Sequence, residues 1–230
     1  MRKSNLCRLD CFALRARNDV RGFTLAEVLI TLGIIGVVAA LTLPSLIQIY
    51  REKVIITKVK KYYSVLSQAH QRAVEEYGDP ANWDLIANNS IPGAKNMAEK
   101  FIPYLQVTSS KPARAGYEVT LQNGDRILFE VRSADCTAVR GTEELRKGCG
   151  LLYLAPYKTV WAQKDGIDIF GFILTQNRII PRGVPGDNMP FPSYCTKSGG
   201  LACTAWVLYN ENMDYLRCSG LSWNGKTKCK

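Results

Sequence analysis

The cysteines are the residues of this sequence most able to form covalent bonds, and they fall into two groups. Cys7 and Cys11 lie in a basic N-terminal segment, and six lie in the second half: Cys136, Cys149, Cys195, Cys203, Cys218 and Cys229. With one histidine in the chain, three disulfides explain these six better than zinc, and disulfides indicate a periplasm or the exterior. Six cysteines allow 15 pairings. Pairing in sequence order would close three short loops, each contributing about 2–4 kcal/mol.

Other residue types that could do chemistry give weaker signals. His70 lies on an apolar stripe, which favours a half-buried, hydrogen-bonded side chain over a catalytic or metal-binding one. Asp165, Asp168 and Asp187 could gather near one loop, but their spacing matches no calcium-binding pattern. The sequence has no nucleophile motif, phosphate-binding loop or ligand cluster. It therefore predicts a protein that is not an enzyme, with no catalytic residue, no metal and no cofactor.

A single carboxylate, Glu27, interrupts a long apolar run that extends from Phe23 to Tyr50. This run meets the length of about 20 residues that a helix needs to cross a bilayer. An acidic side chain in hydrocarbon costs roughly 2.5–3.5 kcal/mol, so Glu27 either reaches the interface or pairs with a positive group of a neighbouring subunit. Pro44 removes one helical hydrogen bond and predicts a kink or local opening.

The charges that flank this run predict its orientation. The first 22 residues hold six basic and two acidic residues, a net charge of +4 out of the formal +10 of the chain. Cationic segments resist translocation, so this end is expected in the cytoplasm and the bulk of the chain outside it. An ordinary signal peptide is the competing interpretation, but it is cut after its apolar core. Here the unusual sequence, RGFTLAE, precedes the core.

The sequence GFTLAE at 22–27, followed by the apolar run, resembles the processing site of type IV prepilins and type II secretion pseudopilins. The resemblance implies that a prepilin peptidase cuts between Gly22 and Phe23 and methylates the new amine of Phe23. It also implies that Glu27, as the fifth mature residue, pairs with that amine in an adjacent subunit, and that residues 36–44 unwind on assembly. The implied partners are the peptidase/methyltransferase, other pilin or pseudopilin subunits and an inner-membrane assembly platform.

The residues beyond the apolar run predict an α+β head. Apolar positions recur at three- and four-residue steps, which continues the N-terminal helix into water with one face packed on a domain. These positions are Ile56, Val59, Tyr63, Leu66, His70, Ala73 and Tyr77. Gly78-Asp79-Pro80 ends this helix. The expected fold is a long helix laid on an antiparallel sheet, pilin-like, with a disulfide-stapled C-terminal region.

The further expected elements follow from turn residues and strand composition. Asn123-Gly124 accepts the positive φ angles of a tight turn, which predicts a hairpin at 117–131. Prolines and glycines predict a loop rather than an element from 181 to 192. The remaining expected elements are a short helix at 96–105 and strands at 151–162 and 167–175.

These expectations divide the chain into a leader at 1–22, a transmembrane and filament-core helix at 23–50, a soluble helix at 51–78 and a head at 79–230. The expected protein is a structural, minor subunit of a type II secretion pseudopilus or type IV pilus. It would first span the inner membrane once, with a cytoplasmic N-terminus and a periplasmic or extracellular head. The alternative is a DNA-uptake pilin that binds nucleic acid through its basic head and four tryptophans, Trp83, Trp161, Trp206 and Trp223. Its lysines are spread out, which makes this interpretation the weaker one.

Overall fold

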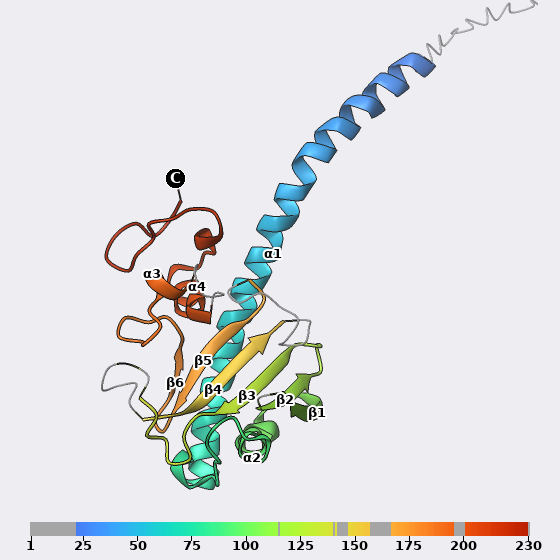
Figure 1. Ribbon diagram of the computed structural model, residues 1–230. Coiled ribbons are helices and arrows are strands. Elements are labelled where there is room, and N and C mark those ends of the chain that lie inside the picture. The colour runs from blue at the N-terminus through green and yellow to red at the C-terminus, as the bar shows by residue number, and fades with distance from the viewer. Residues whose placement is uncertain are drawn as a thin grey trace, which may run out of the picture. The chain divides into compact units, whose positions relative to one another are not determined.

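The computed structural model describes residues 22–114, 116–139, 141, 147–156, 167–195 and 201–229. The chain divides into two compact units between Ile47 and Gln48, and each is described by itself. Helix α1 (Leu25–Tyr77) includes residues of both units (Figure 1). The predicted leader lies outside the described residues except for Gly22.

The first unit contains most of the apolar part of α1, up to Ile47. It meets the length and composition of a membrane-crossing helix, with a mean hydropathy of 2.3 over its most apolar window. The helix continues through Pro44, so the predicted local opening is not found in the described helix. Two side-chain hydroxyl groups add hydrogen bonds to the backbone near Pro44. Thr42 Oγ1 donates to Val38 O at 2.9 Å, and Ser45 Oγ donates to Thr42 O at 2.9 Å. Unwinding on assembly stays a prediction.

The second unit contains one six-stranded antiparallel sheet in which neighbours in sequence are neighbours in space (Figure 1). The hairpin expected around Asn123-Gly124 is confirmed, with Tyr117 opposite Phe129 and Thr120 opposite Arg126. The strands are β1 (Val107–Ala113), β2 (Gly116–Leu121), β3 (Arg126–Val131), β4 (Gly148–Ala155), β5 (Phe170–Thr175) and β6 (Ile179–Pro181). The predicted long helix and antiparallel sheet are therefore both present.

The core lies between α1, α2 (Ile91–Phe101) and one face of the sheet. Side chains that alternate along the strands, such as Ile127 and Phe129, belong to the same buried cluster as Leu66 of α1. The buried face of α1 differs from the predicted stripe: Tyr62 and Ala69 are buried, whereas Tyr63 and Tyr77 are only partly buried. The packed face follows the 3.6-residue period of the helix. Starting from Val59, it therefore passes through Tyr62 and Ala69 rather than through Tyr63 and Tyr77.

Several predicted boundaries were wrong. Helix α2 begins at Ile91, not 96, because Ser90 accepts a hydrogen bond from Gly93 N at 3.2 Å and caps the helix. Strands β1 and β6 were not predicted at all. The expected strand at 151–162 begins at Gly148 and is described only to Ala155, since residues 157–166 lie outside the described residues.

The C-terminal region consists of short helices rather than a loop alone. The apolar segment that begins at Thr204 is helix α4 (Thr204–Asn210), preceded by α3 (Phe191–Tyr194). Short 3-10 helices complete the described elements: η1 (Pro80–Asn82), η2 (Ile102–Tyr104), η5 (Leu201–Cys203) and η6 (Asp214–Leu216).

Candidate functional site

The start of α1 presents the predicted processing residues to solvent. Gly22 and Phe23 precede the first turn, and the Phe23 side chain is 88% exposed. A side-chain carbon added at Gly22 would meet no atom within 4 Å. In this structure nothing else in the described chain crowds this peptide bond, so an enzyme can reach it.

Glu27 has a local partner that the sequence interpretation missed. Its carboxylate accepts hydrogen bonds from Thr24 N and Thr24 Oγ1, both at 2.9 Å, and Thr24 Oγ1 accepts one from Glu27 N at 3.2 Å. This reciprocal arrangement is a capping box, which satisfies otherwise unpaired N–H groups of the first turn. Its signal, Thr-x-x-Glu, was present in the sequence. The carboxylate of Glu27 is therefore hydrogen-bonded within one subunit.

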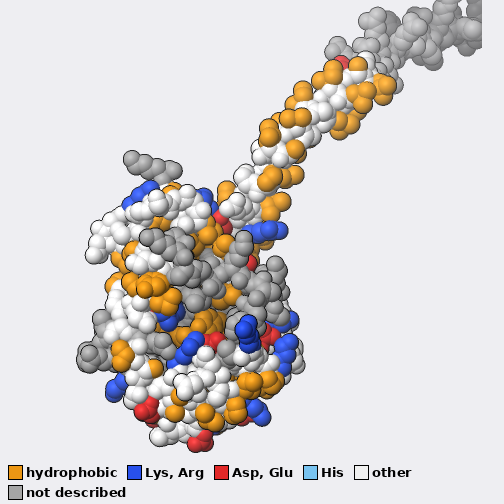
Figure 2. Space-filling view, viewed as in Figure 1, with side chains coloured by type: hydrophobic (Ala, Val, Ile, Leu, Met, Phe, Trp, Pro, Cys, Tyr) orange, Lys and Arg blue, Asp and Glu red, His pale blue; other side chains and the backbone are white. Residues whose placement is uncertain are grey.

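The surface of α1 that follows Glu27 is apolar and exposed. Figure 2 shows hydrophobic side chains around this part of the helix. The exposed large side chains here are Val28, Leu29, Ile30, Leu32, Ile34, Ile35, Val37, Val38, Leu41, Leu43, Leu46, Ile47, Ile49 and Tyr50. An exposed apolar surface of this kind marks a membrane-embedded segment or an interface with other chains.

The six cysteines of the second unit lie in three pairs in sequence order. The sulfur atoms are 1.96 Å apart in Cys136–Cys149, 1.87 Å in Cys195–Cys203 and 2.19 Å in Cys218–Cys229. Each pair closes a short stretch of chain, and the last two lie in the C-terminal region. Cys7 and Cys11 lie outside the described residues.

The last disulfide lies beside a charged network that reaches α1. Arg217 Nη1 donates to both carboxylate oxygens of Glu52, at 2.6 and 2.7 Å, and Arg217 Nη2 donates to Asp214 Oδ1 at 2.6 Å. Asp214 Oδ2 accepts from Cys229 N at 2.7 Å. Burial opposes the ionisation of Asp214, but these hydrogen bonds outweigh it and lower its pKa. Sequence reasoning missed this network.

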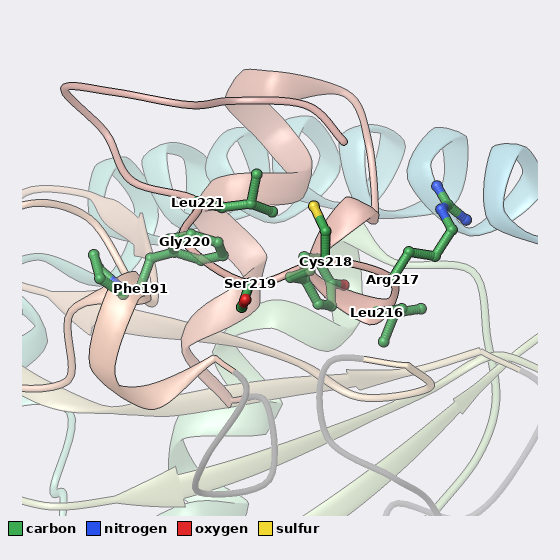
Figure 3. Close-up of a pocket in the computed structure, with 9 residues that line it drawn as sticks. Phe191, Leu216, Arg217, Cys218, Ser219, Gly220 and Leu221 are labelled. Atoms are coloured by element: carbon green, nitrogen blue, oxygen red, sulfur yellow. The ribbon is translucent and has the colours of Figure 1, made fainter. Parts of the chain in front are cut away.

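A cavity of about 420 Å³ opens next to the same disulfide (Figure 3). Phe191 and Pro192 of α3 form one side, and the segment from Tyr215 to Leu221 forms the other. Figure 3 shows Arg217 directed away from the cavity toward α1. Its guanidinium is therefore used in the network with Glu52 rather than offered to a ligand.

The remaining candidate residues are structural. His70 is buried, more deeply than predicted, and its Nε2 lies 3.1 Å from Thr175 O. Burial lowers the pKa of His70, and the hydrogen bond to Thr175 opposes this shift. Asp187 is buried and its Oδ2 lies 3.0 Å from Arg182 Nε, so that carboxylate is already neutralised by a cation. Asp165 lies outside the described residues.

The tryptophans do not form an exposed binding surface in the described chain. Trp83 and Trp206 are fully buried, and Trp223 is partly buried against Trp206, with ring centroids 5.3 Å apart. Trp161 lies outside the described residues. Stacking of bases requires exposed aromatic faces, so the described tryptophans do not favour the nucleic-acid alternative.

Comparison with known proteins gives two family matches. Residues 17–43 match the prokaryotic N-terminal methylation motif. Residues 45–135, which include the C-terminal part of α1 and the β2–β3 hairpin, match a family of unknown function (DUF6613). No curated protein and no solved structure matches the chain. The first match covers the GFTLAE sequence and most of the exposed apolar run.

Proposed function

This chain belongs to the type IV pilin-like and pseudopilin family, because it carries the N-terminal methylation motif of that family, and from this membership we propose that it is a minor structural subunit of a type II secretion pseudopilus or a type IV pilus. The observation that carries the proposal is the joint presence of this motif and an exposed apolar helix that follows it directly. The motif indicates a structural subunit rather than an enzyme. The 208 residues that follow Gly22 in this chain favour a minor or specialised subunit over a minimal one.

In the proposed pathway, the precursor spans the inner membrane with residues 1–22 in the cytoplasm. A prepilin peptidase cuts between Gly22 and Phe23 and methylates the amine of Phe23. The exposure of this peptide bond and the lack of a side chain at Gly22 support this step, since a protease must approach the backbone closely. The head lies in the periplasm or outside the cell, which agrees with its three disulfides.

Assembly then exchanges one set of partners for another. In the isolated subunit, Glu27 accepts hydrogen bonds from Thr24. In the filament, the charged amine of Phe23 on an adjacent subunit offers a stronger, charge-assisted partner for the same carboxylate. The exposed apolar surface of α1 meanwhile leaves lipid for the helices of neighbouring subunits. An inner-membrane assembly platform carries out this transfer.

Processing is tested by mass spectrometry of the chain purified from cells that contain a prepilin peptidase. We expect a mature protein that begins at N-methylated Phe23, and an uncut precursor for Gly22→Val. The matched control is Gly33→Val, because Gly33 is also exposed in α1 and has no atom within 4 Å of an added side-chain carbon. Cleavage of Gly22→Val at the normal rate, or equal loss of cleavage in the control, would refute the assigned site.

Assembly is tested separately with Glu27→Gln. The amide keeps hydrogen-bonding capacity but loses the charge that attracts an amine. We expect normal cleavage and methylation together with the loss of subunits from sheared filaments. Incorporation at the wild-type level would show that Glu27 does not pair with a neighbouring amine.

A further inference from the structure

We propose that Arg51, Lys53 and Lys61, on the first turns of α1 beyond the apolar run, form a docking surface for anionic phospholipid headgroups. We call these three residues the juxtamembrane cationic face. The inference rests on the proposed function, because it requires that the apolar part of α1 spans a membrane before assembly. It adds a lipid class as a partner of the soluble half of the helix.

The charge of this part of α1 is strongly one-sided. Between residues 51 and 74 the sequence holds six Lys or Arg residues and one acidic residue, Glu52. Glu52 does not offset its neighbours, because its side chain is buried and receives two hydrogen bonds from Arg217. Two of the lysines also have acidic partners: Lys58 pairs with Asp125 at 2.7 Å and Lys60 pairs with Glu211.

The three residues of the juxtamembrane cationic face lack such partners. Arg51, Lys53 and Lys61 are exposed. Within the described part of the chain, no carboxylate lies within ion-pair distance of them, and the nearest recorded interaction is Lys61 Nζ at 5.7 Å from the centre of the Tyr62 ring. An exposed cation without an acidic partner in the same chain is not neutralised, so its charge can attract an anionic partner.

The position of these residues along the helix selects a lipid. Tyr50 ends the apolar run and is 69% exposed, and tyrosine is enriched at the membrane–water interface. At about 1.5 Å rise per residue, Lys53 lies about 4.5 Å and Lys61 about 16 Å beyond Tyr50 along the helix. The headgroup layer extends about 5–8 Å beyond the hydrocarbon core on each side, so Arg51 and Lys53 lie within it and reach headgroup phosphates with their flexible side chains. Lys61 lies beyond this layer and acts through the surface potential of the headgroups, which falls off over a Debye length of about 8 Å. Anionic headgroups therefore match these residues in charge and in position.

Nucleic acid is a poorer match for the same charge. Single strands bind through exposed aromatic rings as well as cations, and Trp83 and Trp206 are buried. Duplex binding would need a groove or stripe of phosphate contacts, whereas these three side chains extend along one helix next to the apolar run. The favoured partner is thus the membrane surface itself.

The test uses full-length chain reconstituted into phosphatidylcholine vesicles that contain a trace of spin-labelled phosphatidylglycerol or spin-labelled phosphatidylcholine. Electron paramagnetic resonance gives the association of each labelled lipid with the protein. One cation near an anionic surface corresponds to up to about fivefold in affinity. We expect phosphatidylglycerol to be preferred by about three- to fivefold, and the preference to fall toward one in 1 M salt, where the screening length is about 3 Å.

The variant Arg51→Gln/Lys53→Gln/Lys61→Gln is expected to lose this preference. The matched control, Arg72→Gln/Lys95→Gln/Lys226→Gln, removes three exposed charges elsewhere and is expected to keep it. No preference in the wild type, its retention in the first variant or its equal loss in the control would overturn the inference. So would salt-sensitive retention of duplex DNA on the wild-type vesicles that the first variant lacks, because that result assigns the face to nucleic acid.

Flotation of the same samples after an alkaline wash separates this inference from the proposed function. A chain that floats with the vesicles but shows no lipid preference refutes the docking surface alone. A chain that is washed off pure phosphatidylcholine vesicles refutes the membrane anchor, and the lipid inference with it.

Discussion

Asp125 connects the β2–β3 turn to α1, and its replacement by alanine is expected to destabilise the head strongly. The Asp125 side chain is fully buried, and its carboxylate accepts hydrogen bonds at 2.7 Å from Lys58 Nζ, Tyr62 Oη and Asn123 Nδ2. Asp125→Ala removes the acceptor and leaves the ammonium of Lys58, whose side chain is only 15% exposed, without this carboxylate.

The size of the effect follows from these contacts. Hydrogen bonds to a charged group contribute about 1.5–3 kcal/mol each, and the loss of one partner of a buried ion pair costs about 3–5 kcal/mol. Three such hydrogen bonds would sum to about 4.5–9 kcal/mol, but contributions within one network are not additive. The ion-pair estimate therefore sets the expected loss in the free energy of unfolding, about 3–5 kcal/mol. This is a large part of the roughly 5–15 kcal/mol by which a domain is stable.

The assay is urea unfolding of the full chain in detergent micelles, followed by tryptophan fluorescence, which reports on the head. The control is Glu99→Ala, which removes one partner of an exposed pair with Lys95 and is expected to change stability by less than about 0.5 kcal/mol. In a double-mutant cycle with Lys58→Met, the double variant should lose at least about 2 kcal/mol less than the sum of the singles. A value for Asp125→Ala equal to that of the control would refute the reasoning.

Three further predictions use the same unfolding assay. Burial lowers the pKa of His70, so the unfolded chain takes up a proton before the folded chain does as pH falls through about 6.5. Part of the stability is therefore lost as pH falls below that value, and His70→Gln should flatten this dependence. Arg217→Ala should cost about 1–3 kcal/mol, because it leaves buried Glu52 without its cation and with only the hydrogen bond from Gln48 Nε2 at 3.2 Å, while Arg217 itself is 41% exposed. Wild-type stability would contradict this. Replacing Cys218 and Cys229 by serine should cost about 2–4 kcal/mol, and peptide mapping without reduction should link these two residues in the wild type.

The parts of the fold that local chemistry determines could be predicted from the sequence. The β2–β3 hairpin followed from Asn123-Gly124, and Gly124 has the positive φ of 81° that such a turn requires. The end of α1 followed from Gly78, which has a φ of 76°. In each case the deciding residues lie within a few positions of the element, so spacing alone contains the information.

Elements that depend on a neighbour could not be predicted in this way. Strand β1 is an edge strand whose side chains are mostly exposed, so it lacks the apolar alternation by which strands are recognised. It forms because its backbone pairs with β2, as between Lys111 and Glu118. Strand β6 is three residues long and ends at Pro181, a residue that signals a loop. Its pairing with β5 outweighs that signal.

The two glutamates near the ends of the apolar run show how far such reasoning extends to a functional site. Glu27 has its partner, Thr24, three residues away, and the Thr-x-x-Glu spacing predicts the contact. Glu52 has its partner, Arg217, 165 residues away, and only the complete fold brings them together. From sequence, Glu52 is simply one of the first charges of a soluble helix, yet the structure leaves it 8% exposed.

This burial changes how the end of the apolar run should be understood. By composition the run ends where charge begins, and Arg51, Glu52 and Lys53 sum to a net charge of +1. In the fold, Arg217 neutralises Glu52 from the C-terminal region, and Arg51 and Lys53 remain exposed as unbalanced cations. The C-terminal network thus determines the net charge that α1 presents just beyond Tyr50. Arg217→Ala should therefore weaken the lipid preference as well as the head, because an unpaired Glu52 would again offset its neighbours.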